Sequence, residues 1–388
     1  MGSLLLWPDM LREKRTLAWH PLKLYLGLIA VQFVSLIWSP EPIEGLKYLA
    51  YLLPFVLIVV AAKSVASAHP RIIVWTVLVF ALGALVEAAL VILFQLRPDL
   101  ENQFLQSSIA GVFITPNELT MLFDQARNNV LDEGKAGGFF INANRAACFL
   151  GIAALVVWGF AGALRSRLLK IVGTVLWVSV FFTGSKAAAA LAVATLMMTW
   201  FAPALLPGSR ALPRIKVMFG ALVLVAAVTA AAMNTEYSQG SRATFDERQL
   251  IWAHAQEQFR SHPLAGLGFG GWQLSFAVYA AKVGLNTNYP PHNTLVFIWS
   301  QSGLIAALIA AGFMLSVLRF GVRAYRAVAP EARALPLAMT MAFFWTFIQG
   351  MGENFGIVGE MHMQPLLALA LGTTYSLCDG TGSVRRFS

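Results

Sequence analysis

The most regular feature of the chain is a series of long apolar stretches that alternate with short polar segments. A helix that crosses a membrane needs about 20 apolar residues, whereas a strand of a membrane barrel shows alternating polarity. Stretches of suitable length and continuity lie at 22–38, 43–62, 71–96, 137–160, 168–183, 184–206, 215–233, 293–318, 335–352 and 358–378. The pattern predicts an all-α, polytopic transmembrane helical bundle of about ten spans, with a re-entrant or surface helix at 104–123.

The composition agrees with a membrane protein. Of the 388 residues, 58% are hydrophobic and 12% are charged, against about 45–50% apolar and 25% charged in soluble domains. The two cysteines, Cys148 and Cys378, are expected at opposite ends of the bundle, so a disulfide framework is not indicated. Because His254, His262 and His362 lack the spacing of metal ligands, we expect neither a metal site nor a cofactor.

The charged residues predict the orientation of the bundle. If the spans alternate, most of the 28 Lys and Arg residues fall on one face, and most of the 19 Asp and Glu residues fall elsewhere. The positive-inside rule then makes both termini cytoplasmic. The net charge of +9 is explained by this topology signal, so no nucleic-acid partner is expected.

Two long segments, 97–136 and 234–292, are predicted to face outward, and loops of such length are commonly functional. The second contains an amphipathic helix from Asp246 to Phe259, a break at His262 and Pro263, and a glycine-rich turn at 266–271. The turn matches G-x-G-x-x-G, but no strand-helix-strand unit surrounds it. A tight turn is therefore a better interpretation than a nucleotide site.

Three cations at the predicted outer face are candidate site residues. Arg145 and Lys186 do not fit the positive-inside pattern, and a charge within a membrane costs about 2.5–3.5 kcal/mol on insertion scales. The alternatives for these two are snorkelling to lipid headgroups or pairing with Glu353 or Glu87. Arg248 lies on the amphipathic helix, where it is equally compatible with a solvated surface charge.

A histidine opens one of the apolar stretches. His292 follows two prolines and precedes the run that starts at 293, so its ring is expected at the membrane interface as a general base or a structural cap. Glu353, Glu360 and His362 lie at the outward ends of the last two spans, where they could bind sugar hydroxyls, act as a second base or close the helix ends. Glu87 is expected to face the bundle and a partner there.

Three motifs occur in a characteristic order. They are Thr183-Gly-Ser-Lys-Ala-Ala, then Glu247-Arg-x-x-x-Trp252 with Pro263-Leu-Ala-Gly-Leu-Gly-Phe-Gly, and finally His292-Asn-x-x-Leu followed by Ser302-Gly-Leu. Together they resemble the O-antigen ligase and polymerase superfamily of bacterial envelope glycosyltransferases. The resemblance divides the chain into N-terminal helices with the first outer loop (1–136), a catalytic core including loop 234–292 (137–320), and C-terminal helices (321–388).

The resemblance implies a fold similar to the GT-C glycosyltransferases, with as many as twelve spans. It implies an undecaprenyl-pyrophosphate-linked glycan as donor, no metal, and an active site at the periplasmic face of the bacterial inner membrane. Carried over residue by residue, it makes His292 and Arg248 catalytic and assigns pyrophosphate binding to Lys186, Arg248 and Arg145. His292 is the candidate base, and the alternative is that it hydrogen-bonds the pyrophosphate. The family usually has arginine at the position of Lys186, and lysine lacks the planar fork that grips a phosphate at two points.

The resemblance also implies the reaction. The leading hypothesis is an O-antigen ligase of lipopolysaccharide biosynthesis, which transfers the glycan to lipid A core among the membrane lipids. The alternatives are an O-antigen or exopolysaccharide polymerase, a protein O-oligosaccharyltransferase, and a transporter of lipid-linked sugars. The single dominant outer loop favours the ligase. A transporter would place ionisable residues near the midplane, where only Glu87 is predicted.

Overall fold

The computed structural model describes residues 21–114, 119, 134–205, 237–287, 289–353 and 355–379. Within these ranges all the regular elements are helices, and the one β-type pairing is an isolated bridge between Ile357 and Gly359. The predicted all-α fold is therefore confirmed for the described part of the chain.

Five helical segments in the described ranges are long and apolar enough to cross a membrane. They are α3 (Pro21–Val34) with η1 (Ser35–Trp38), α4 (Pro42–Ala50) with α5 (Leu53–Ala68), α6 (Pro70–Leu96), α10 (Ala143–Ala163) and α16 (Thr294–Ala327). A shorter apolar helix, α12, spans Lys186–Phe201. The span expected at 215–233 lies outside the described residues, so the total of about ten spans stays a prediction.

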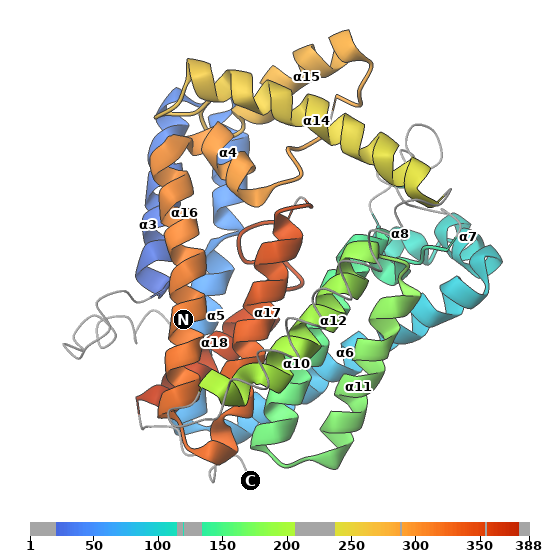
Figure 1. Ribbon diagram of the computed structural model, residues 1–388, viewed down its shortest axis with the longest axis vertical. Coiled ribbons are helices and arrows are strands. Elements are labelled where there is room, and N and C mark those ends of the chain that lie inside the picture. The colour runs from blue at the N-terminus through green and yellow to red at the C-terminus, as the bar shows by residue number, and fades with distance from the viewer. Residues whose placement is uncertain are drawn as a thin grey trace.

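The remaining bundle helices are α11 (Arg167–Phe182), α17 (Ala334–Gly350) and α18 (Gln364–Cys378). Helix α10 is the most buried of the five membrane-length segments and packs against α6, α11 and α17, while α16 packs against α3 and α17 (Figure 1). Close approach of α10 and α17 depends on small residues. A side chain at Gly159 would meet the Cβ of Ala338, which is the packing expected where membrane helices touch.

An outer layer covers one end of the bundle, called the α14 end below. It contains α4, α7 (Pro98–Gln106), α8 (Ala110–Phe113), α14 (Tyr237–Ser261) and α15 (Gly271–Val283), and α14 runs across this end (Figure 1). The short elements η2 (Gly138–Phe140), η3 (Ala202–Leu205) and η4 (Pro330–Ala332) lie in connections. The described parts of the two long predicted loops thus lie at the same end.

Helix α14 contains the predicted amphipathic helix and ends just before the His262–Pro263 break. Its inward face packs on α15 through a small core of buried residues, namely Ile251, Ala255, Trp272, Phe276 and Ala280. The compact helical loop is therefore confirmed over its described residues. The helix expected at 104–123 is divided instead into α7 and α8, because the chain turns at Ser107; residues 115–118 and 120–133 lie outside the described part.

The glycine-rich turn fills a break in α16. Gly303 interrupts that helix with φ 79° and ψ −177°, which leaves backbone groups on both sides without helical partners. The turn supplies them, since Leu267 N donates to Ser300 O at 2.7 Å and Pro263 O accepts from Leu304 N at 3.2 Å. The tight turn predicted at 266–271 is thus a structural connection between the outer layer and α16.

The two cysteines lie at opposite ends, as predicted. Cys148 is buried in the second turn of α10 near the α14 end, and Cys378 is the last residue of α18 at the other end. Both are free thiols.

Candidate functional site

Three helices begin at the α14 end with side-chain caps. Asn142 accepts hydrogen bonds from the first-turn amides of α10, Ser185 does so for α12, and Asn293 does so for α16. These residue types are the preferred N-caps, because their oxygens satisfy amides that the helix leaves unpaired. Each such helix start carries a partial positive charge and favours anions.

Hydrogen bonds join the capped helix starts to one another. Ser185 Oγ donates to Asn144 Oδ1 at 2.6 Å, which links α12 to α10. Asn293 Nδ2 donates to Met351 O at 3.2 Å, which links the start of α16 to the loop after α17. Glu353, in the same loop after α17, accepts a hydrogen bond from Asn144 Nδ2, so the three N-termini belong to one hydrogen-bonded cluster.

Two arginines enter this cluster, each paired with a carboxylate of the loop between α17 and α18. Arg145 Nε lies 2.9 Å from Glu360 Oε1, and Arg248 lies 3.4 Å from Glu353 Oε1. The partner of Arg145 is thus Glu360, neither Glu353 nor Glu87. Asn144 Nδ2 donates to the same Glu353 oxygen at 2.8 Å, so the first turn of α10 contacts both pairs.

The electrostatics of the two carboxylates follow from their setting. Burial raises the pKa of Glu353, and the nearby cations, Arg248 first, oppose that rise. Burial likewise raises the pKa of Glu360 against the attraction of Arg145. Both carboxylates are therefore protonated more readily than exposed glutamates.

His292 stands beside Arg248 at the start of α16. Its backbone has φ 50°, a left-handed conformation that is uncommon for a residue with a side chain. Burial, and then the charge of Arg248, lower its pKa to about 4. Its buried Nδ1 has no hydrogen-bond partner among the described residues. The ring is therefore a neutral imidazole at neutral pH, with one nitrogen unengaged.

Two tryptophans of the outer layer hold the segment that leads to His292. Trp252 Nε1 of α14 donates to Pro291 O, and Trp272 Nε1 of α15 donates to Tyr289 O, both at 3.0 Å. The Tyr289 ring in turn meets the His292 ring edge-on, with centroids 5.8 Å apart. The outer layer thus sets where the histidine lies.

Lys186 is the first residue of α12, directly after the capping Ser185. Its backbone belongs to the cluster, and its side chain is exposed. The sequence-predicted residues Arg145, Lys186, Arg248 and His292 therefore all lie at the α14 end, with the contacts above joining Arg145, Arg248 and His292 to the network.

Two further carboxylates act on the backbone that leads into α10. Glu87, buried in α6, accepts from Phe139 N at 3.0 Å, and Glu101 of α7 accepts from Gly137 N at 3.4 Å. Glu87 faces the bundle as predicted, and the partner shown here is a peptide amide. The pair fixes the turn that positions Arg145.

Sequence reasoning missed the polar residues that link the helices. Asn144 contacts Ser185 and Glu353, and its backbone oxygen accepts from Gln349 Nε2 at 2.9 Å. Trp345 donates to Gln349 Oε1 at 2.6 Å within α17. Their position at the ends of otherwise apolar stretches is the sequence feature that could have indicated this linking role.

Apolar helices of membrane length, packed in a bundle, indicate a helical, multi-pass membrane protein. Its capped helix starts and its two arginines gather at one end, and helix starts in general favour anions. Its glutamates and neutral histidine add acid-base groups to that arrangement.

Residues 172–311 match the model of a family described as O-Antigen ligase. The matched segment contains Lys186, Arg248 and His292, whereas Arg145 precedes it. The match supports the resemblance that the motifs predict, to the O-antigen ligase and polymerase family of membrane glycosyltransferase-like enzymes, over this segment of the chain. Comparison with curated proteins gives no match.

Proposed function

We propose that the protein is an O-antigen ligase, which transfers a glycan from an undecaprenyl-pyrophosphate carrier to lipid A core. The observation that carries the proposal is the gathering of Arg145, Arg248 and three capped helix starts beside a neutral His292. In this proposal the α14 end faces the periplasm, the bundle lies in the bacterial inner membrane, and both termini are cytoplasmic.

The leaving group of this reaction is a diphosphate, and its growing charge must be stabilised. Charge-assisted hydrogen bonds from guanidinium groups and amides aimed from helix starts supply such stabilisation. Arg145 and Arg248 are suitably placed, with Lys186 at the start of α12 as a third cation. When the donor binds, the arginines exchange Glu360 and Glu353 for phosphate oxygens.

The attacking group is a sugar hydroxyl, which must lose its proton as the new glycosidic bond forms. A neutral imidazole can accept that proton, and His292 is kept neutral by burial and by Arg248. Negative charge from a bound diphosphate would offset the effect of Arg248 and raise the proton affinity of the ring. Donor binding and base strength are therefore coupled through Arg248.

The apolar helices of the bundle offer a lipid-facing surface for the polyprenyl tail. A lipid-borne donor would therefore place its tail against the bundle and its diphosphate against the arginines at the α14 end. The dominant outer loop, with α14 and α15, supports the ligase over the polymerase.

The test is in vitro transfer by purified protein from one carrier-linked donor, with two acceptors compared in parallel. Lipid A core is expected to be glycosylated and a second carrier-linked glycan is not. Growth of the glycan on its carrier, with lipid A core left unmodified, would show a polymerase instead. Protein with His292→Asn serves as the inactive control.

A further inference from the structure

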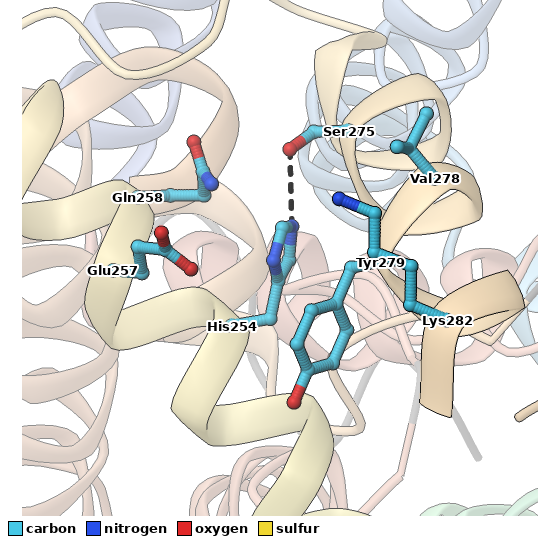
Figure 2. Close-up of a pocket in the computed structure, with 7 residues that line it drawn as sticks. All are labelled: His254, Glu257, Gln258, Ser275, Val278, Tyr279 and Lys282. Carbon is cyan, nitrogen blue, oxygen red and sulfur yellow. Dashed lines mark hydrogen bonds between the residues drawn. The ribbon is translucent and has the colours of Figure 1, made fainter. Parts of the chain in front are cut away.

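A pocket of about 350 Å³ opens between α14 and α15 in the outer layer. Helix α14 contributes three of its lining residues and α15 contributes four, namely His254, Glu257, Gln258, Ser275, Val278, Tyr279 and Lys282 (Figure 2). The volume lies within the range of about 300–1,000 Å³ that is typical of small-ligand sites. His254 is six residues beyond Arg248 on the same helix, which is about 9 Å along its axis.

The wall of the pocket is built around a buried histidine. His254 is only 4% exposed, and its Nε2 lies 3.0 Å from Ser275 Oγ, the contact dashed in Figure 2. Its ring stacks on Tyr279 with centroids 4.7 Å apart. The histidine therefore fixes both the hydroxyl and the aromatic ring, and the hydroxyl keeps further hydrogen-bonding capacity for a ligand.

The lining favours a hydroxyl-rich ligand without a strong net charge. Gln258, Ser275 and Tyr279 can each donate and accept hydrogen bonds, and one acid, Glu257, is matched by one base, Lys282. Burial lowers the pKa of His254, so the imidazole adds no positive charge at neutral pH. A diphosphate would find no net positive charge here, because Glu257 offsets Lys282, whereas a sugar ring both donates and accepts hydrogen bonds.

The pocket is packed onto the segment that carries His292. Trp272 touches His254 edge-on, with centroids 5.5 Å apart, and donates to Tyr289 O at 3.0 Å. The Tyr289 ring meets His292. A ligand held against His254 is thus connected, through two aromatic residues, to the candidate base.

We propose that the pocket between α14 and α15 is a saccharide subsite that holds one sugar residue of a glycan away from its reacting end. The identity of that glycan rests on the proposed function, whereas sugar binding itself does not. The subsite would give the outer layer a direct part in holding substrate, in addition to positioning His292.

The test is saturation-transfer difference NMR on the purified full-length chain, with glucose, galactose, rhamnose and N-acetylglucosamine as separate probes. Ser275→Trp fills the pocket, and Gln273→Trp is the matched control, because it places the same ring on an exposed position of α15 outside the lining. At least one sugar is expected to give ring-proton signals with wild type and with the control, and Ser275→Trp is expected to reduce them at least fivefold. Ser275→Ala, a milder change, should reduce them at least twofold and decides the matter if the tryptophan variant does not fold.

Wild-type protein that gives no signal with any of the four sugars would overturn the proposal. So would equal signals from wild type and from a folded pocket variant. The transfer assay separates this proposal from the proposed function. Sugar binding that depends on Ser275, without any glycan transfer, would support the subsite and contradict the proposed transferase function. Normal glycan transfer, with sugar binding unaffected by the Ser275 variants, would support the transferase function and contradict the subsite.

Discussion

Arg248 in α14 and Glu353 after α17 are 105 positions apart in the chain, and their side chains meet at 3.4 Å. The same carboxylate oxygen accepts a hydrogen bond from Asn144 at 2.8 Å, in the first turn of α10. One glutamate thus ties the outer layer to the bundle and occupies the guanidinium surface that a diphosphate would use. Donor binding is expected to compete with this ion pair.

Replacing Arg248 by alanine is expected to lower the rate of glycan transfer by roughly 10- to 100-fold. A hydrogen bond to a charged group contributes about 1.5–3 kcal/mol, which corresponds to a loss of that size. The measurement is the initial transfer rate of purified protein at fixed donor concentration. Arg260→Ala is the control, because Arg260 is an exposed arginine in the last turn of the same helix. A rate within twofold of wild type for Arg248→Ala would leave this arginine as a surface charge.

His292→Asn is expected to abolish transfer while the protein remains folded. Asparagine tolerates the left-handed backbone found at this position, so the change removes the imidazole without adding strain. Loss of a general base costs about 10²–10⁴-fold in rate. Transfer rates, gel-filtration profiles and lipopolysaccharide ladders of complemented cells check the prediction, with the exposed His262→Ala as control. Normal ladders from His292→Asn would remove the histidine from the chemistry.

The contribution of His292 to the stability of the protein is expected to fall as the pH is lowered from about 6.5 towards 4. In this window the unfolded chain binds a proton at His292 that the folded chain does not, because the folded pKa is about 4 and the ordinary value is 6.5. The contribution at pH 5 is of order 1–2 kcal/mol in the free energy of unfolding. Denaturant unfolding in detergent at pH 7 and pH 5 measures it. His292→Asn should lose less stability over this interval than wild type, and equal losses would contradict the cited shift.

Lys186→Arg is expected to retain activity, whereas Lys186→Ala is expected to lose at least fivefold. The lysine is exposed at the first position of α12, so a longer guanidinium side chain fits without repacking, and the charge is kept. Donor titration of the transfer rate separates a change in apparent KM from one in kcat. Inactivity of the arginine variant would mean that the shape of lysine, in addition to its charge, is required.

Much of the fold follows from local sequence patterns. Continuous apolar stretches predict the helices of the bundle, and the amphipathic pattern from Asp246 predicts most of α14. Helix α15 was not predicted, because it begins after Gly270 and ends at Gly284, both with positive φ, and has no polar capping side chain. The last span begins at Gln364, six residues later than 358, because the preceding residues form the turn that carries Glu360.

Part of the candidate site was also predictable from the pattern of apolar stretches. Alternation of spans is sufficient to bring Arg145, Lys186, Arg248 and His292 to one end. It does not determine which carboxylate meets which arginine, since those contacts depend on how the last two helices pack. The partners Glu353 and Glu360 come from beyond residue 320, the expected limit of the catalytic core, and α16 itself continues through that limit.

The break at Gly303 separates the first turns of α16 from the part of the helix that lies deeper in the bundle. The first segment is held by Leu267 N, which donates to Ser300 O, and by Pro263 O, which accepts from Trp299 Nε1, in place of an unbroken helical ladder. Changes in the outer layer can therefore alter the position of His292 without altering the lipid-facing helices. The outer layer and the helical bundle are therefore joined at a break in the backbone, where the position of His292 and the packing of the membrane-length helices can vary separately.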